Sequence, residues 1–292
     1  DAGTETGVTS TGVTSTGMTS IVITGANGFI GSLLASRLTI GAAVAIGGTS
    51  RTISKRTLID QYIPDDGANS GEWIKGDLGA LIADRPEIFT GADVVVHLAS
   101  AVSGECEADL DLGLNANLFA GIALGRCLAA TPKKPMLVFA SSLAIYGGTP
   151  DMPLAELITD TTRPTPQNSY GAQKLMLEEF YADLARRGMI SSRSVRLMTV
   201  SVRPGKPNAA ASSFLSGMIR EPLQGERANV PVDTGLRVVL NSPTAAVDGF
   251  IHAMSIDDNS WGAPLGLNLP GISVTVGEMV EALREVGGED AV

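Results

Sequence analysis

The fold of this chain is predicted most directly by residues 20–38, which read SIVITGANGFIGSLLASRL. The apolar residues 21–24 predict a β-strand, and the apolar positions of the helix that follows fall on one face. The turn between them has GxxGxxG spacing, formed by Gly25, Gly28 and Gly31. Glycine allows a tight turn and lets the backbone approach a pyrophosphate at the helix N-terminus. The strand–turn–helix context therefore predicts a dinucleotide-binding site, which also includes Asn27, Phe29 and Ile30.

Short strand-like runs alternate with helical patterns along the next part of the chain. Strands are expected at 56–60, 72–77, 93–100, 135–142 and 194–204, and helices near 108–129 and 169–187. This alternation predicts an α/β fold with a doubly wound parallel sheet (Rossmann) over residues 18–204. Beyond residue 204, helices are expected near 212–221, 243–255 and 276–286, and strand-like runs at 229–232 and 236–240. We expect residues 205–292 to form a smaller, less regular C-terminal substrate lobe.

Composition narrows the class of protein. A chain of 292 residues can bury a large core, as one large domain or two merged ones. Its net charge of −10 offers no basic footprint for nucleic acid and no polybasic membrane patch. Two cysteines and two histidines predict neither a disulfide framework nor a metal site. The cysteine usage indicates a reducing compartment, so we expect a cytoplasmic protein. The acidic charge and the absence of an apolar run of ~18–20 residues lead us to expect no nucleic-acid or membrane partner.

The N-terminus is a segment of low complexity. The motif TGVTS occurs twice and TGMTS once, in tandem, within residues 6–20. Such a small, polar composition cannot bury enough apolar surface to order the backbone. We expect residues 1–17 to be a disordered tail.

Two positions compete to contact the adenosine ribose of the dinucleotide. A carboxylate there accepts hydrogen bonds from the ribose hydroxyls and repels a 2′-phosphate, whereas an arginine favours the phosphate. Residues 42–51 lie at the usual distance from the glycine turn and offer Arg51, which would indicate NADP. Residues 55–62 contain the better strand, RTLID, and offer Asp60. We favour Asp60, and therefore NAD as the cofactor.

The strand after Asp60 ends in the motif GDL, which contains Asp77 and Leu78. These two residues stand where an adenine-edge contact would come. The pattern fits a turn that ends the strand equally well.

A tyrosine and a lysine four residues apart carry the predicted chemistry. In NSYGAQK, residues 168–174, Tyr170 and Lys174 share one face of a predicted helix. A cation beside a phenol lowers the phenol's pKa, so the pair fits a general base near neutral pH; by itself it more often marks a helix surface. Ser142 ends the fifth predicted strand, at the edge where doubly wound sheets bind ligands. The predicted catalytic residues are therefore Ser142, Tyr170 and Lys174.

These motifs together resemble the extended short-chain dehydrogenase/reductases, or NAD-dependent epimerase/dehydratase family, from about Ser20 to the C-terminus. The matching motifs are TGANGFIG, GDL, HLAS, SSLAIYG and SYGAQK. Tyr146 in IYGG is not the catalytic tyrosine, because no lysine follows it at four residues. The resemblance implies a homodimer formed through the helices near 108–129 and 169–187. It also implies further cofactor contacts, namely Leu98, Ala99, Asn117 (which would steady the active-site region) and Thr199.

A narrower resemblance concerns the substrate. The block VRPGKPNAAASSFLSGMIREPLQGE, which starts at Val202, resembles the branch of the family that oxidises small sugar acids with NAD. Met198 stands where this branch usually carries proline, and Cys106 where it carries alanine. The chain also stops earlier than this branch leads us to expect, so we expect the substrate lobe to be C-terminally incomplete.

The resemblance to this branch implies oxidation of the C2 hydroxyl of a four-carbon sugar acid. Tyr170 would take the hydroxyl proton, Lys174 would lower the pKa of Tyr170 and hold the nicotinamide ribose, and Ser142 would hydrogen-bond the reacting oxygen. Further substrate contacts are expected from Ser103, Glu105 and Asn208. The substrate's carboxylate needs a nearby cation, and the candidates are Arg203, which fits a packed structural role equally well, and Lys206. His97 fits a hydrogen bond at a strand end better than catalysis.

Two other functions stay open. A nucleotide-sugar epimerase or dehydratase on the same scaffold would use NAD transiently and keep it bound. A non-catalytic NAD-binding protein would not need the Ser–Tyr–Lys set. Net NADH formation with sugar acids, and none with nucleotide sugars, would distinguish a dehydrogenase from both.

Overall fold

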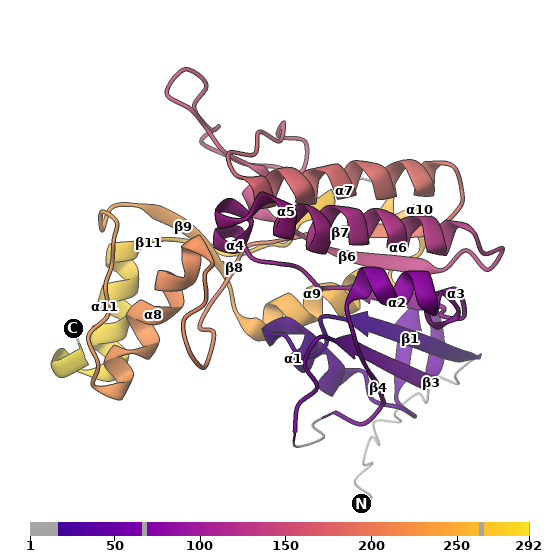
Figure 1. Cartoon of the computed structure of the whole chain (residues 1–292). Helices are drawn as coiled ribbons and strands as arrows, with labels where there is room; N and C mark the ends of the chain where they lie inside the picture. The colour runs from indigo at the N-terminus through magenta and orange to yellow at the C-terminus, as the bar shows by residue number, and fades with distance from the viewer. Residues whose placement is uncertain (1–16, 66–68, 263–265, 292) are drawn as a thin grey trace, which may run out of the picture.

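The computed structural model describes residues 17–65, 69–262 and 266–291 (Figure 1). The tail expected over residues 1–17 therefore lies, except for Gly17, outside the described residues. The described part of the chain forms one large and one small β-sheet, with helices on both faces of the large sheet.

The large sheet confirms the predicted doubly wound α/β fold. Its strands follow the order β10 (Gly266–Asn268), β7 (Ser191–Leu197), β6 (Met136–Ser142), β5 (Val94–His97), β1 (Met18–Thr24), β3 (Thr49–Asp60) and β2 (Ala43–Ile46), and β4 (Glu72–Lys75) also pairs with β3. All pairs are parallel except β2 with β3. The chain leaves β1 for β3 on one side and returns to β5 on the other. This reversal is the point where such sheets bind ligands.

The region between the glycine turn and Asp60 contains a hairpin that the sequence pattern did not reveal. Strand β2 runs antiparallel to the first half of β3, and the second half of β3 pairs with β1. Gly47 and Gly48 connect the two strands with φ values of 55° and 78°, which glycine adopts without a Cβ clash. The favoured strand, RTLID, therefore lies beside β1, and residues 42–51 form the hairpin.

Alternate residues of the strands face two helical layers, as the period of two in a β-strand requires. Ile21, Ile23 and Val138 belong to the core beneath α1 (Phe29–Arg37) and α9 (Pro243–Ser255). Val22 and Phe139 belong to the opposite core, covered by α2 (Leu78–Asp84), α3 (Glu87–Thr90), α6 (Ala120–Ala129) and α7 (Ser169–Arg186). Figure 1 shows α6 and α7 side by side on this second face.

A helical run follows β5 and leads into the second layer. It consists of α4 (Ser103–Ala108), α5 (Leu110–Gly113), a π-helical segment η1 (Leu114–Phe119) and α6. Contrary to expectation, residues Leu110–Ala129 are long and apolar enough, by length and composition alone, to cross a membrane. Leu124 and Leu128 are completely buried in the core, which explains this composition. The expected absence of a membrane partner stays a prediction.

The small sheet contains β8 (Thr199–Val200), β9 (Arg237–Asn241) and β11 (Ile272–Thr275). It shares a core with α8 (Phe214–Arg220) and α11 (Val276–Gly287), formed by Leu215, Met218, Leu240, Val276 and Met279. The strand expected at 229–232 is absent from the described structure. Pro231 cannot donate to a strand ladder, and Val230 and Val232 pack against this core from a loop.

The chain beyond residue 204 contributes to both sheets, because β10 pairs with β7 of the large sheet and α9 packs on that sheet. The domain division at 204/205 stays a prediction about folding units. The remaining short elements are η2 (Leu143–Ile145), η3 (Ala211–Ser213), η4 (Pro222–Gln224), α10 (Asp258–Trp261) and η5 (Glu289–Ala291).

Candidate functional site

The glycine turn joins β1 to α1, and at two of its three glycines there is no room for a side chain. Gly25 has φ +70°, and a Cβ there would lie 2.7 Å from the backbone nitrogen of Ala99. A Cβ on Gly31 would lie 2.0 Å from the carbonyl oxygen of Gly25. A Cβ on Gly28 would meet only that same oxygen, at 3.1 Å, and is otherwise open. The turn is therefore closed against β5 and open over the start of α1.

The start of α1 suits a phosphate group. Gly28 precedes the helix in an extended conformation and supplies no side-chain cap, and no acidic residue lies in the first turn. The first N–H groups, which include those of Phe29 and Ile30, thus have no capping side chain. Together with the open side of Gly28, this arrangement fits the pyrophosphate of a dinucleotide.

Asp60 lies at the glycine turn, whereas Arg51 does not. Asp60 ends β3, and its Oδ2 accepts a 3.0 Å hydrogen bond from the backbone of Asn27. Its Oδ1 accepts one of 3.1 Å from the backbone of Tyr62. Arg51 pairs with Val44 in the antiparallel half of β3, toward the opposite edge of the sheet. Of the two sequence candidates, only Asp60 is therefore in reach of a nucleotide on the turn.

Asp77 and Leu78 begin helix α2. The Oδ1 atom of Asp77 accepts a 3.0 Å hydrogen bond from the backbone of Ala80, which makes Asp77 the helix N-cap. Leu78 is buried in the core. The turn interpretation is confirmed, and the adenine contact stays a prediction.

Helix α7 brings Tyr170 and Lys174 to Ser142. Asn168 caps this helix by accepting a 2.7 Å hydrogen bond from the backbone of Gly171. A Cβ on Gly171 would lie 2.0 Å from the carbonyl oxygen of Ala144, so the helix packs directly on the backbone that follows Ser142. The hydroxyl groups of Ser142 and Ser100 lie next to the phenol of Tyr170 and influence its ionisation. The predicted catalytic residues therefore meet at the carboxyl ends of β5 and β6.

Lys174 lies beneath the phenol ring of Tyr170. Its Nζ is 5.4 Å from the centroid of that ring and 4.8 Å from that of Phe139. The same atom donates a 2.8 Å hydrogen bond to the carbonyl oxygen of Ala140. Lys174 is only 2% exposed, so its position is fixed by packing on all sides.

The ionisation of this pair differs from the sequence-based expectation. Burial raises the pKa of Tyr170 to about 12, although hydrogen bonds with Ser142 and Ser100 lower it. Burial lowers the pKa of Lys174 to about 7, against the raising effect of Glu178. The expected lowering of the Tyr170 pKa by Lys174 is therefore wrong for the protein by itself. Burial is the largest influence on each of the two groups, and it disfavours the charged form of both.

Asn117 holds the loop after β5 against α7. Its Oδ1 accepts hydrogen bonds from the backbone of Ala101 (2.8 Å) and from the hydroxyl of Ser100 (3.1 Å). Its Nδ2 donates to Gln173 Oε1 at 2.9 Å and to Cys106 Sγ at 3.3 Å. Asn117 lies in the π-helical segment η1, a geometry often found at functional sites. It thereby fixes Ser100, one of the two hydroxyl groups next to the phenol of Tyr170.

His97 has the strand-end role that the sequence favoured. It is buried, its Nδ1 lies 2.8 Å from Thr24 Oγ1, and its ring stacks on Phe139 at 5.6 Å. Burial, and then the charge of Lys174, lowers the pKa of His97 to about 3. The imidazole is therefore neutral at physiological pH, and the hydrogen-bonding interpretation is confirmed.

A buried ion pair next to the catalytic residues was missed. Glu178 and Arg196 are 3% and 6% exposed, and Arg196 binds both carboxylate oxygens of Glu178 at 2.7–3.1 Å. Ser141, the neighbour of Ser142, also donates to Glu178. The pair thus joins α7 to β6 and β7. One signal was present in the sequence, because Glu178 follows Lys174 by the same four residues that separate Lys174 from Tyr170.

The expected substrate residues form two groups. Ser103 Oγ accepts a 3.1 Å hydrogen bond from the backbone of Ala211, and the backbone of Asn208 donates to Ser213, so the loop with Asn208 lies against the start of α4. Glu105 instead caps α4 through the backbone of Val102. The other group contains the candidates for the substrate's carboxylate, of which Lys206 is exposed. Thr199, which is expected as a cofactor contact, is half-buried on β8.

Both backbone polar groups of Arg203 form hydrogen bonds with side chains. Its N–H donates to Ser216 Oγ at 2.9 Å, and its carbonyl accepts from Arg220 at 2.6 Å. Its side chain is half-buried and takes part in no ion pair within the described residues. The structural role of its backbone is therefore clear, and a contact with substrate stays a prediction.

The chain is similar to a known protein family, to curated enzymes and to a solved structure. The profile of the NAD dependent epimerase/dehydratase family matches residues 21–240. The D-erythronate dehydrogenase of Cupriavidus necator is 43% identical over 270 residues, which cover 92% of this chain and 82% of that protein. The Haemophilus influenzae protein of the same name is 39% identical, with the same coverage. The crystal structure of a nucleoside-diphosphate-sugar epimerase from Agrobacterium tumefaciens superposes with a TM-score of 0.84 at 39% identity, covering 95% of this chain and 81% of that one.

Proposed function

The chain belongs to the NAD-dependent epimerase/dehydratase family, and on this premise we propose that it oxidises the C2 hydroxyl of a small sugar acid, D-erythronate, to 2-dehydro-D-erythronate with NAD. The observation that carries the proposal is the proximity of Tyr170 to Ser142 and to the buried Lys174, two strands along the sheet from the glycine turn. The names of the two curated relatives support the substrate.

NAD is proposed to lie across the carboxyl edge. Its pyrophosphate would rest on the open side of Gly28, at the N–H groups of Phe29 and Ile30. Asp60 would accept hydrogen bonds from the adenosine ribose, and its charge would repel a 2′-phosphate. The remaining contacts are proposed from Asn27, Asp77, Leu78, Leu98, Ala99 and Thr199, with Tyr170 and Lys174 at the nicotinamide ribose. When bound, NAD supplies the acceptor for a hydride.

Tyr170 is the base in this proposal. The C2 hydroxyl gives its proton to Tyr170 Oη, and the C2 hydrogen leaves with both bonding electrons, so that a C2 carbonyl forms. Ser142 Oγ hydrogen-bonds the reacting oxygen and fixes its distance from the base. To accept this proton, Tyr170 must be a phenolate, which burial disfavours. The protonated form of Lys174 beneath the ring would supply the counter-charge for the phenolate.

The substrate is proposed to lie beside the contact between the loop after β5 and the loop of residues 208–213. Ser103 and Asn208 stand on facing sides of this contact and would bind the hydroxyls. The carboxylate would pair with Arg203, whose side chain has no ion-pair partner in the described part of the chain, or with Lys206. The role expected of Glu105 is weakened, because its carboxylate caps α4.

Net oxidation distinguishes this proposal from a nucleotide-sugar epimerase, which the similarity to the Agrobacterium tumefaciens structure favours as the second candidate. The purified protein is incubated with NAD and either D-erythronate or UDP-glucose, and NADH is followed by its absorbance. A dehydrogenase should form NADH with D-erythronate and not with UDP-glucose. Epimerised UDP-sugar without net NADH would establish the second candidate instead.

We also propose a homodimer through α5, η1 and α7. Leu112, Phe119 and Met176 are 43%, 53% and 48% exposed on neighbouring elements. Such apolar exposure on adjacent helices is typical of an interface. The mass measured by light scattering should be that of a dimer, and Phe119→Asp should shift it to a monomer. Leu236→Asp, which changes an equally exposed residue next to β9, should leave the dimer intact.

A further inference from the structure

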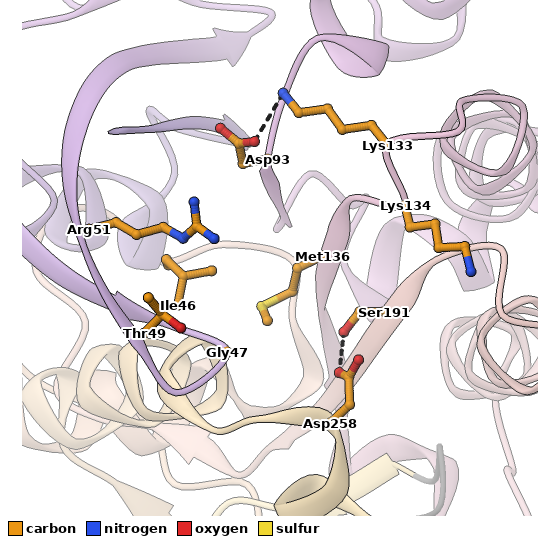
Figure 2. A pocket seen from close by; sticks show the side chains of 10 residues that line it. All are labelled: Ile46, Gly47, Thr49, Arg51, Asp93, Lys133, Lys134, Met136, Ser191 and Asp258. Carbon is orange, nitrogen blue, oxygen red and sulfur yellow. Dashed lines mark hydrogen bonds and ion pairs between the residues drawn. The ribbon is translucent and has the colours of Figure 1, made fainter. Parts of the chain in front are cut away.

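A pocket lies at the amino ends of the parallel strands, whereas the glycine turn lies at their carboxyl ends. Its volume is about 310 Å³, and it is surrounded by the β2–β3 hairpin and by the residues that precede or begin β5, β6 and β7 (Figure 2). Arg51, the residue first considered as an NADP contact, lines it together with Lys133 and Lys134. The proposed NAD-dependent reaction does not involve this pocket.

The carboxylates of the pocket already have cationic partners. Asp93 Oδ1 pairs with Lys133 at 3.0 Å, and Asp258 Oδ1 pairs with Arg193 at 2.6 Å. Neither Arg51 nor Lys134 forms an ion pair within the described residues. Among residues 17–65, 69–262 and 266–291, the charges of Arg51 and Lys134 in this pocket thus have no carboxylate partner, in a protein whose net charge is −10.

Arg51 is placed to bind rather than to support the fold. Figure 2 shows its guanidinium pointing into the pocket from the hairpin side. Its Nε is buried and has no hydrogen-bond partner in the described part of the chain. A buried donor without a partner is destabilising, and an acceptor inside the pocket would relieve that cost. Ile46 and Met136, which are 8% and 7% exposed, provide an apolar base beside it.

We propose that this pocket binds the oxyanion group of a small metabolite, a phosphate or a carboxylate, between Arg51 and Lys134. A guanidinium offers parallel N–H donors that match two oxygens of either group. Lys134 lines the wall across from Arg51, and its exposed, flexible side chain can add a second charge. The volume suits a molecule of metabolite size. The site is separate from the glycine turn, because it lies at the amino ends of the parallel strands.

Isothermal titration of the full chain tests the proposal with two probes, inorganic phosphate and malonate, at low ionic strength. Saturable binding of at least one is expected, and which one binds identifies the group. Arg51→Gln and Lys134→Gln should each weaken the affinity by at least about tenfold. The matched control is Lys55→Gln, also on β3, where Lys55 pairs with Glu72 at 3.0 Å. Its affinity should equal that of the wild type.

Phosphate could also bind at the glycine turn, so the variants decide the outcome. The proposal is overturned if neither probe gives saturable binding, or if both Arg51→Gln and Lys134→Gln bind as the wild type does. Circular dichroism checks that each variant is folded. A failure of the NAD-dependent reaction would leave this result unaffected, because the titration measures binding without NAD or sugar acid.

Discussion

The backbone amide of Asn27 donates a 3.0 Å hydrogen bond to Asp60, so that one carboxylate joins the glycine turn to the end of β3. The second oxygen of Asp60 is held by the backbone of Tyr62. Its position is thus fixed before any nucleotide binds. A carboxylate fixed at this point would discriminate against a 2′-phosphate by charge repulsion.

Asp60→Asn should relax the choice between NAD and NADP. Asparagine keeps an oxygen for the Asn27 amide and removes the negative charge. The ratio of kcat/KM for NAD to that for NADP should therefore fall by at least about tenfold. Arg51→Gln is the matched control and should leave the ratio unchanged, because Arg51 lies toward the other edge of the sheet. A change in the control and none in Asp60→Asn would refute our assignment of the cofactor contacts.

Two glycines of the turn should respond differently to a single methyl group. In Gly28→Ala the Cβ meets only one protein atom, and the φ of −66° suits alanine. The free energy of unfolding of this variant should differ from that of the wild type by no more than about 1 kcal/mol. Its affinity for NAD should nevertheless be at least about tenfold weaker. In Gly31→Ala the Cβ would lie 2.0 Å from the Gly25 carbonyl oxygen, so the fold itself should lose about 1–3 kcal/mol. Denaturant unfolding and NAD titration measure both. Full NAD affinity in Gly28→Ala would argue against a pyrophosphate at this turn.

The buried pair of Glu178 and Arg196 should contribute strongly to stability. Glu178→Gln leaves the Arg196 guanidinium buried without its counter-charge, which should lower the free energy of unfolding by about 3–5 kcal/mol. Asp183→Asn breaks an exposed pair with Arg186 on the same helix and should cost no more than about 1 kcal/mol. Urea unfolding distinguishes the two. Equal costs for both variants would mean that the buried pair has no special role in joining α7 to the sheet.

His97 should make the protein sensitive to acid. The pKa of His97 is about 3 in the folded protein, whereas the ordinary value, which applies to the unfolded chain, is 6.5. Between these two pH values the imidazole is protonated in the unfolded chain and neutral in the folded protein. The neutral imidazole therefore costs the folded protein no stability above about pH 6.5, and the free energy of unfolding falls as the pH drops below that value. Between about pH 7 and about pH 5 the wild type should lose about 2 kcal/mol more than His97→Gln. Identical pH dependence in the two proteins would contradict the neutral, buried imidazole.

Much of the fold could be predicted from local sequence because its signals are local. The strand before the glycine turn and the strand that ends at Ser142 are apolar runs, and most of their residues are buried. The β2–β3 hairpin was missed because its pairing is antiparallel within a region that the alternating pattern marks as parallel. Residues 229–232 resemble a strand by composition, but Pro231 and the packing of the two valines hold them in a loop.

The members of the candidate site could be predicted, but their ionisation could not. Ser142, Tyr170 and Lys174 follow from motif spacing, and the structure brings them together. Their pKa values depend on burial, which arises only when α7 packs on β6 and on the Asn117 region. The same holds for Glu178, whose partners Ser141 and Arg196 come from two different strands. The role of Arg51 likewise depended on which half of β3 it occupies.

The most direct test of the proposed chemistry is the rate of NADH formation from D-erythronate and NAD by Tyr170→Phe, measured beside its affinity for NAD. Phenylalanine keeps the ring above Lys174 and removes only the hydroxyl that accepts the proton. The rate should fall by roughly 10²–10⁴-fold, with NAD affinity changed no more than about threefold. Tyr146→Phe, whose hydroxyl donates to Asn268 away from Ser142, should retain most of the activity. A Tyr170→Phe enzyme that oxidises D-erythronate at the wild-type rate would contradict the account.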